Sequence, residues 1–250
     1  MPSEGELLAS IAVVRGDFSL DVSIVVPPGI TILFGPSGSG KSTTLAAIAG
    51  LLRPERGRVA VGGDVWFDST AGVDLPVHRR GLAFVFQSLA LFPHMTALAN
   101  VEYGIDRALA AGERRKRAAA MLERMKVAHL AARRPATYSG GEAQRVALAR
   151  AFARSPRLVL LDEPFSAMDR ELRRELCNDV RATVRDLSLA TVMVTHHRQE
   201  ARWMGERAIV LAEGRVQSEG AAEAILAEGG PDAAEDLASG PRNRRSEGAS

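Results

Sequence analysis

The sequence predicts an α/β protein with a parallel sheet core, an antiparallel β region before it and a helical subdomain inserted into it. Short apolar strands alternate with helical stretches in the second half of the chain, which is typical of parallel sheets. Closely spaced strand patterns instead occur at residues 7–26 and 58–67. Between these parts, about residues 98–134 are rich in Ala, Arg, Leu and Met, with apolar positions at helical spacing.

The antiparallel region is predicted from two pairs of short strands. Residues 7–13 and 20–26 have strand patterns, and residues 58–61 and 65–67 flank a turn of two glycines and an aspartate. Residues 30–34 then form an apolar strand that runs directly into a glycine-rich loop. This last strand is expected to belong to the parallel core.

The rest of the core is predicted from strands and helices in alternation. A helix over 41–49 ends at Gly50, a typical C-terminal stop. Further elements are expected as a helix at about 141–154, a strand at 158–161, a helix near 170–187, a strand at 191–195 and a hairpin of 208–211 with 215–217. We therefore expect one domain over residues 1–228, with a helical subdomain at about 88–155 inserted. Residues 229–250 have almost no large apolar side chains, and we expect a disordered tail there.

Composition limits the possible partners and location. The 250 residues have a net charge of only +2, so we expect no nucleic acid partner. Nine Lys/Arg against two Glu lie within 107–134, either as a solvated helical face or as a basic surface for anionic lipid headgroups. The single cysteine, Cys177, excludes an intrachain disulfide. No apolar run reaches the length of a membrane span and no secretion signal begins the chain, so we expect a cytoplasmic protein that reaches a membrane through a partner.

The loop after residues 30–34 matches the pattern G-x-x-x-x-G-K-[ST] between a predicted strand and a predicted helix. Backbone N–H groups of such a loop converge on phosphate oxygens, Lys41 adds charge at the β- and γ-phosphates, and Ser42 can ligate Mg²⁺. A merely flexible glycine loop is the alternative. The pattern predicts a P-loop NTPase that binds ATP and magnesium. The candidate nucleotide-binding residues are Gly35, Pro36, Ser37, Gly38, Ser39, Gly40, Lys41, Ser42 and Thr43.

Two adjacent carboxylates, Asp162 and Glu163, follow the predicted strand 158–161. They are expected at the carboxyl edge of the sheet, where ligands of such sheets bind. Asp162 is predicted to hold Mg²⁺ and Glu163 to polarise the attacking water, because phosphoryl transfer requires an oriented nucleophile. Two acids after a strand can also be a helix-capping pair. The phosphate loop favours the catalytic interpretation.

The sequence Tyr-Ser-Gly-Gly-Glu at 138–142 resembles the signature of ABC-type ATPases. The family pattern usually begins with Leu and often ends with Gln, so Tyr138 and Glu142 depart from it. Ser139, Gly140 and Gly141 are intact, and a hydroxyl with two glycine amides at a helix N-terminus makes a second phosphate site. The resemblance implies a dimer in which each ATP lies between the 35–43 loop of one subunit and the Ser139 loop of the other.

Three shorter motifs follow the order of the same family. Gln87, after Val-Phe, resembles the Q-loop glutamine, which implies contact with Mg²⁺ and the lytic water and marks the contact with the permease. Asp169 resembles the D-loop aspartate. His196 resembles the switch histidine that donates to the γ-phosphate. His197 stands where the family commonly has Asp, and no role is assigned to it.

An aromatic side chain that stacks on adenine is expected before the phosphate loop. Phe18 is the candidate, although a residue in the core of a strand explains it equally well. His78, His94 and His129 have no metal-ligand spacing and are expected to be surface or packing residues.

Residues 65–105 are most similar to the ATPase subunits of molybdate importers, and importers of sulfate, iron and polyamines share part of the pattern. The resemblance implies ATP hydrolysis that powers transport through transmembrane permease subunits, at the cytoplasmic face of the inner (plasma) membrane. It also implies a homodimer or a paired ATPase subunit, and an indirect partner in a periplasmic or extracellular solute-binding protein. Many molybdate-type subunits continue into an oxyanion-binding domain, whereas only a polar tail follows here.

Two other functions share the catalytic residues. An exporter ATPase has the same set, so only residues 65–105 favour an importer. A DNA-repair ATPase would interpose a long coiled coil between the Q-loop and the signature. Gln87 and Ser139 are 52 positions apart, which leaves room for a compact helical subdomain only.

Overall fold

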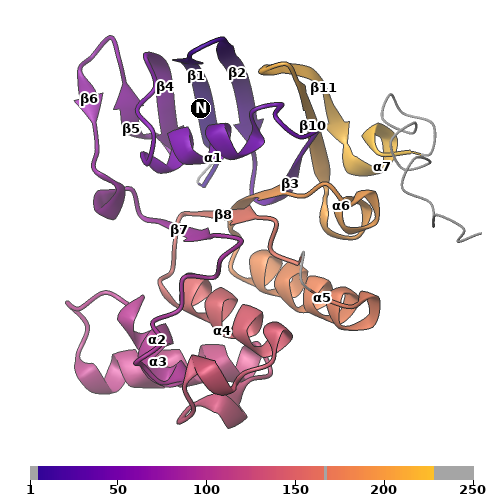
Figure 1. The fold of residues 1–250 in the computed structure, drawn as a ribbon. Helices are drawn as coiled ribbons and strands as arrows, with labels where there is room; N and C mark the ends of the chain where they lie inside the picture. The colour runs from indigo at the N-terminus through magenta and orange to yellow at the C-terminus, as the bar shows by residue number, and fades with distance from the viewer. Residues whose placement is uncertain (1–4, 166–167, 228–250) are drawn as a thin grey trace, which may run out of the picture.

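Two β-sheets and the helices around them make up the fold (Figure 1). The structure is a computed structural model that describes residues 5–165 and 168–227. The predicted disordered tail at 229–250 lies outside the described residues. Both predicted parts of the β framework are present, which confirms the α/β class.

The first sheet is entirely antiparallel and has the strand order β2-β1-β4-β5-β6. Its strands are β1 (Leu7–Arg15), β2 (Phe18–Val26), β4 (Arg56–Val61), β5 (Asp64–Asp68) and β6 (Val73–Asp74). Side chains in β2 alternate between buried and exposed, as one packed and one solvated face require. The two-residue strand β6 was not predicted, because two residues carry no periodicity.

The second sheet has the order β11-β10-β3-β9-β8-β7, with parallel pairing from β10 to β7 and an antiparallel hairpin at the β11 edge. Its strands are β3 (Gly29–Phe34), β7 (Leu82–Val85), β8 (Leu158–Asp162), β9 (Ala190–Val194), β10 (Arg207–Ala212) and β11 (Arg215–Ala221). All five residues of β9 are buried, as expected for a central parallel strand. The four-residue strand β7 was not predicted, because four residues are too few to show a clear strand period.

Pairing register aligns the carboxyl ends of four parallel strands. Val85 of β7 pairs with Leu161 of β8, and Val194 of β9 pairs with both Asp162 of β8 and Leu33 of β3. The loops that follow these strands therefore begin at one edge of the sheet. Those loops contain the predicted phosphate-binding, Gln87, Glu163 and His196 motifs.

Helices cover the parallel sheet and form a separate group between β7 and β8. Those that pack on the sheets are α1 (Lys41–Ala49), α5 (Arg170–Asp186), α6 (Arg198–Met204) and α7 (Ala222–Ile225). The group between β7 and β8 consists of α2 (Ala97–Tyr103), α3 (Ala111–Arg124) and α4 (Gly140–Ala153), which contact one another, and α4 also packs on β7. Figure 1 shows this group on the opposite side of the parallel sheet from the antiparallel sheet. The short helices α6 and α7 were not predicted.

A buried arginine ties α1 to the antiparallel sheet. Arg80 is 1% exposed, and its guanidinium donates to the carbonyls of Leu75 (2.8 Å) and Ile48 (2.9 Å) and to Asp74 Oδ1 (3.1 Å). Burial lowers the pKa of Arg80, whereas Asp74 raises it. Gly50 ends α1 in the left-handed conformation, as predicted, and a side chain there would collide with this guanidinium.

Part of the basic stretch 107–134 makes structural contacts. Arg124 donates to Thr183 Oγ1 at 2.9 Å, and Lys126 pairs with Glu175 (2.7 Å) and Asp179 (2.9 Å), so these two cations join the C-terminal end of α3 and the residues just after it to α5. Cys177 is fully buried in α5, and burial raises the pKa of its thiol to about 12. Among the described helices, none combines the length and the apolar character needed to cross a bilayer.

Candidate functional site

The loop between β3 and α1 has a backbone that only glycine allows at two points. Gly35 has φ 146°, and a Cβ there would lie 2.0 Å from the carbonyl oxygen of Leu211. Gly40 has φ 104° and is the N-cap of α1, packed closely against Leu20 and the ring of Phe18. The two glycines fold the loop around the N-terminus of α1, where backbone N–H groups face an incoming anion.

The ammonium group of Lys41 lies over this loop. It donates to the carbonyls of Gly35 (2.8 Å) and Pro36 (2.7 Å), and it is 3.4 Å from Ser39 Oγ. The residue is 8% exposed, so its charge is shielded from bulk water on most sides. A partly dehydrated cation beside a helix N-terminus is a strong site for phosphate.

Ser42 and Asp162, the two residues predicted to hold Mg²⁺, lie next to each other. Ser42 Oγ lies 3.4 Å from Asp162 Oδ1, although the two residues are 120 positions apart in the sequence. Burial raises the pKa of Asp162, and the neighbouring Glu163 charge raises it further, whereas the Ser42 hydrogen bond lowers it. A hydroxyl and a carboxylate oxygen fit Mg²⁺, which uses few protein ligands and keeps several waters. The described residues contain no cluster of three or more His, Cys, Asp or Glu that could hold a metal ion.

Three predicted catalytic side chains meet beside this pair. Glu163 Oε2 is 3.4 Å from Gln87 Nε2, and Glu163 Oε1 is 3.0 Å from His196 Nδ1. The three residues follow the adjacent strands β7, β8 and β9. Glu163 itself has φ 47°, an unusual conformation for a residue with a side chain, and its N–H donates to the carbonyl of Val194 at 3.0 Å. The strand ends thus hold a carboxylate between an amide and an imidazole.

A cavity of about 580 Å³ opens in front of the phosphate loop. It is lined by Arg15, Phe18, Ser37, Gly38, Gly40, Lys41, Ser42, Thr43, Glu163 and Val194. Phe18 is half-buried at the start of β2 and lines this cavity, so it is a strand residue in a position that the predicted stacking on adenine requires. Arg15 was missed by sequence reasoning. It lies at the other end of the same hairpin turn, and a charged residue near a turn gives no signal of its own.

The signature residues begin helix α4 on the other side of the parallel sheet from α1. Ser139 is the N-cap, and its hydroxyl accepts from the N–H of Glu142 at 3.3 Å, while Glu142 Oε2 accepts from the N–H of Ser139 at 2.8 Å. This reciprocal pair is a capping box. Gly141 lies against Leu172 of α5, where a Cβ would approach within 2.4 Å of the leucine, whereas a Cβ at Gly140 would meet nothing within 4 Å. Although the structure describes residues 139–141, none of them lines the 580 Å³ cavity.

Two further motif residues have local roles in the structure. Asp169 is the N-cap of α5, and its Oδ1 accepts from the N–H of Leu172 at 3.0 Å. Residues 166–167, in the middle of the predicted D-loop, lie outside the described part of the chain. The ring of His197 lies 4.0 Å from that of His196, and burial lowers the pKa of His197.

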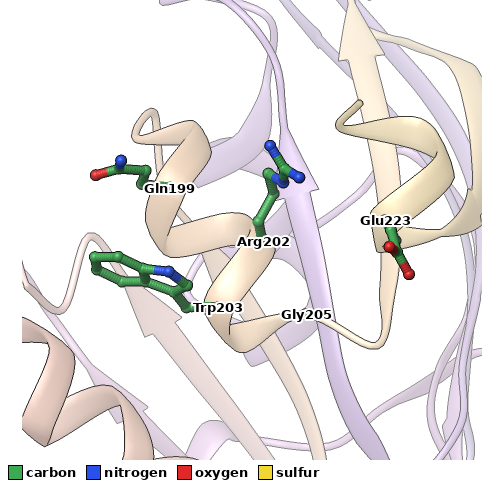
Figure 2. A pocket seen from close by; sticks show the side chains of 5 residues that line it. All are labelled: Gln199, Arg202, Trp203, Gly205 and Glu223. Carbon is green, nitrogen blue, oxygen red and sulfur yellow. The ribbon is translucent and has the colours of Figure 1, made fainter. Parts of the chain in front are cut away.

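A second cavity, of about 430 Å³, lies between α6 and the start of α7 (Figure 2). It is lined by Gln199, Arg202, Trp203, Gly205 and Glu223. None of these residues belongs to a predicted motif. The candidate site is therefore the cavity at the phosphate loop.

The arrangement defines a class of protein: a P-loop nucleotide-binding fold with a second glycine-containing helix N-terminus in an inserted helical region. The chain matches the family model described as ABC transporter over residues 20–166, and it belongs to that family. The match includes residues 138–142 and confirms the family that this motif indicated.

Curated relatives of the chain are named molybdenum import ATP-binding proteins. The chain is 41% identical over 228 residues to the molybdenum import ATP-binding protein ModC 1 of Azotobacter vinelandii. The aligned region covers 91% of this chain and 63% of that protein. It is 42% identical over 221 residues to ModC of Albidiferax ferrireducens, and this alignment covers 88% of this chain and 60% of that protein. The chain thus spans about three fifths of the length of these relatives.

Solved structures agree with the fold. A bacterial ABC transporter cassette, MJ0796, in a dimeric structure has a TM-score of 0.72 and 32% identity, over 87% of this chain and 98% of that one. A dimeric post-hydrolysis state of the same cassette, bound to ADP and Pi, has a TM-score of 0.70 and the same identity and coverage.

Proposed function

We propose that this chain is the ATP-hydrolysing subunit of an ABC importer for molybdate. One observation supports hydrolysis most strongly: Gln87 and His196 converge on Glu163, beside the Ser42–Asp162 pair and at the wall of the phosphate-loop cavity. Binding alone would not need a carboxylate held between an amide and an imidazole.

In the proposed reaction the phosphate loop and Lys41 bind the β- and γ-phosphates, and Phe18 stacks on the base. Glu163 orients a water toward the γ-phosphate and accepts its proton, Gln87 fixes the carboxylate, and His196 donates to the charge that develops on the phosphoryl oxygens. Magnesium, held through Ser42 and Asp162, would neutralise phosphate charge. The position of Lys41, Ser42, Gln87, Asp162, Glu163 and His196 at the carboxyl edge of the parallel sheet supports this reaction, and Phe18 would reach the base from β2 of the antiparallel sheet.

A homodimer, or pairing with a similar ATPase subunit, would complete the site. Ser139, Gly140 and Gly141 lie apart from the cavity of their own chain, and Ser139 and Gly140 are exposed. The structural neighbours are dimeric cassettes. In the proposed dimer, each signature helix faces the γ-phosphate bound by the other subunit.

The permease would contact the surface next to Gln87. A groove of about 440 Å³ there is lined by Phe84, Phe92, Tyr103 and Arg150 among others, and its aromatic wall is open to solvent, with Tyr103 52% exposed. Phe86, directly before Gln87, is 38% exposed and stacks on Phe84 at 4.1 Å. A docked helix of a membrane partner would cover these rings and could move Gln87 through its immediate neighbour.

Molybdate is proposed as the substrate from the names of the curated relatives, with a solute-binding protein acting on the far side of the membrane and this chain at the cytoplasmic face. The test is reconstitution with a molybdate permease and its binding protein in liposomes. We expect ATP turnover to rise with molybdate or tungstate but not with sulfate, ferric iron or spermidine. Stimulation by one of the latter would identify a related importer instead. ATP turnover that is the same with and without each binding protein and its substrate would favour an exporter.

A further inference from the structure

Glu142 occupies two hydrogen-bond donors of the signature loop. Its Oε2 accepts from the backbone N–H of Ser139 at 2.8 Å and lies 3.0 Å from Ser139 Oγ. Because the Ser139 hydroxyl also accepts from the N–H of Glu142 at 3.3 Å, its single proton is directed to the carboxylate. Both donors of Ser139 therefore point to a carboxylate within its own chain.

A phosphate oxygen can bind Ser139 only as an acceptor, since an ionised phosphate has few protons to donate. It must therefore replace Glu142 as the partner of the Ser139 hydroxyl. Hydrogen bonds to a charged acceptor are about twice as strong as neutral ones, and both the carboxylate and the phosphate are charged, so the exchange gains the signature loop little hydrogen-bond free energy. The carboxylate also repels an anion that approaches Ser139.

His129 moderates this effect from a different element. It belongs to the 3-10 turn η2 (Ala128–Leu130), and its Nε2 lies 3.0 Å from Glu142 Oε1, the oxygen that Ser139 does not use. Since a carboxylate oxygen accepts, the imidazole donates. Together with the hydrogen bonds from Ser139, of which the backbone one has the largest effect, this contact lowers the pKa of Glu142 to about 2. Glu142 therefore remains ionised across the neutral range, and His129 draws its charge away from Ser139.

We propose that Glu142 and His129 are positioning residues that set how readily the signature loop binds ATP held by the partner subunit. Glu142 retains the Ser139 donors and opposes closure of the dimer, and His129 weakens that opposition. This inference rests on the proposed ATP-sandwich function. The inference concerns Glu142 and His129, the two side chains that this loop adds to a phosphate site made only of Ser139, Gly140 and Gly141.

The test uses the full-length chain with the Glu163→Gln substitution, so that ATP is not hydrolysed, and measures the monomer–dimer Kd by analytical ultracentrifugation at saturating Mg·ATP. Glu142→Gln replaces the charged acceptor by a neutral one and should tighten the contact about fivefold per site. Because a symmetric dimer contains two such contacts, the dimer Kd should fall about 25-fold. His129→Ala should weaken each contact about threefold and raise the dimer Kd about tenfold.

Three comparisons separate positioning from a general effect on folding. The double variant should match Glu142→Gln, because His129 acts only through Glu142. ATP binding to the monomer should be unchanged in all of these variants, since neither residue lines the phosphate-loop cavity. Glu113→Gln is the matched control: Glu113 is also acidic and in the first turn of a 14-residue helix, α3, but it is exposed.

The outcomes distinguish this inference from the function on which it rests. If Glu142→Gln leaves the dimer Kd unchanged or raises it, or if both single variants shift it in the same direction, Glu142 is only a helix cap and the inference is wrong. Ser139→Ala tests the underlying function. ATP-dependent dimers that form equally well without the Ser139 hydroxyl would contradict the sandwich itself, whatever the other variants do.

Discussion

Replacing Glu163 by Gln should separate ATP binding from ATP hydrolysis. The amide has nearly the same shape as the carboxylate and can still accept from Gln87, which is 3.4 Å away. It cannot take a proton from water, and it loses the charged contact with His196 at 3.0 Å. Loss of a positioned base reduces turnover by at least about 10²-fold, which corresponds to about 2.7 kcal/mol in the barrier.

Nucleotide affinity should remain close to that of the wild type. Lys41 and Ser42 are untouched, and the Glu163 charge is one of the causes that raise the pKa of Asp162. Removing that charge favours the ionised form of Asp162, so the Ser42–Asp162 pair keeps its ability to hold Mg²⁺. We therefore expect bound ATP to persist and the closed dimer to accumulate.

A single-turnover assay with prebound ATP measures the chemical step directly. The control is Glu213→Gln, because Glu213 shares the left-handed backbone (φ 48° against 47° for Glu163) and is exposed. Any effect of Glu-to-Gln exchange on this backbone conformation would appear in both variants. Hydrolysis by Glu163→Gln at the wild-type rate would refute the assignment of Glu163 as the catalytic carboxylate.

Three other predictions concern separate parts of the molecule. Lys41→Ala should weaken nucleotide binding in an equilibrium assay and lower turnover in a steady-state assay. The ammonium group lies over the phosphate loop, so its charge would act on the bound phosphates in both the ground state and the transition state. Full turnover would exclude this loop as the active site. Arg80→Met should lower the free energy of unfolding in urea by about 2–3 kcal/mol, since buried carbonyls lose their donor; an unchanged midpoint would contradict that role. Glu142 has a pKa lowered to about 2, so its contribution to stability is complete above its ordinary pKa of 4.5 and is lost as pH falls toward 2. The difference in Tm between wild type and Glu142→Gln should therefore shrink over that interval, and a constant difference would contradict the capping assignment.

The fold was predictable where local patterns are long. Strands β1, β2, β3 and β8 and helix α1 lie within two residues of their predicted bounds, because apolar strands with clear turn signals and a glycine stop leave little choice. Strand β7 was missed because its four residues are too few to show the alternating pattern of a strand. The helices α6 and α7, with seven and four residues, are stabilised by packing on β3 and β10 rather than by their own pattern.

The candidate site was predictable one motif at a time, but its assembly was not. Each of Gln87, Glu163 and His196 follows a strand, yet only the order β7-β8-β9 in the sheet brings the three together. The residues missed by sequence reasoning are those whose partners lie in other elements. Arg15 reaches the cavity from a hairpin, and Arg80 bonds to α1 across 32 positions. Neither has a neighbour in the sequence that would reveal its role.

The two helix ends proposed to bind phosphate differ in how their donors are occupied, and this difference connects the structure to the proposed control of dimer closure. At α1, the cation of Lys41 bonds to loop carbonyls, so phosphate meets a positive charge and replaces neutral acceptors. At α4, the donors of Ser139 bond to the ionised Glu142, so phosphate meets a negative charge and replaces a charged acceptor. The first end is therefore suited to bind nucleotide in the monomer, and the second to bind it only when dimer contacts add to the free energy. In the proposed dimer this asymmetry predicts that ATP binds to the monomer before the subunits close, and the contrast between monomer affinity and dimer Kd in the Glu142 variants measures it.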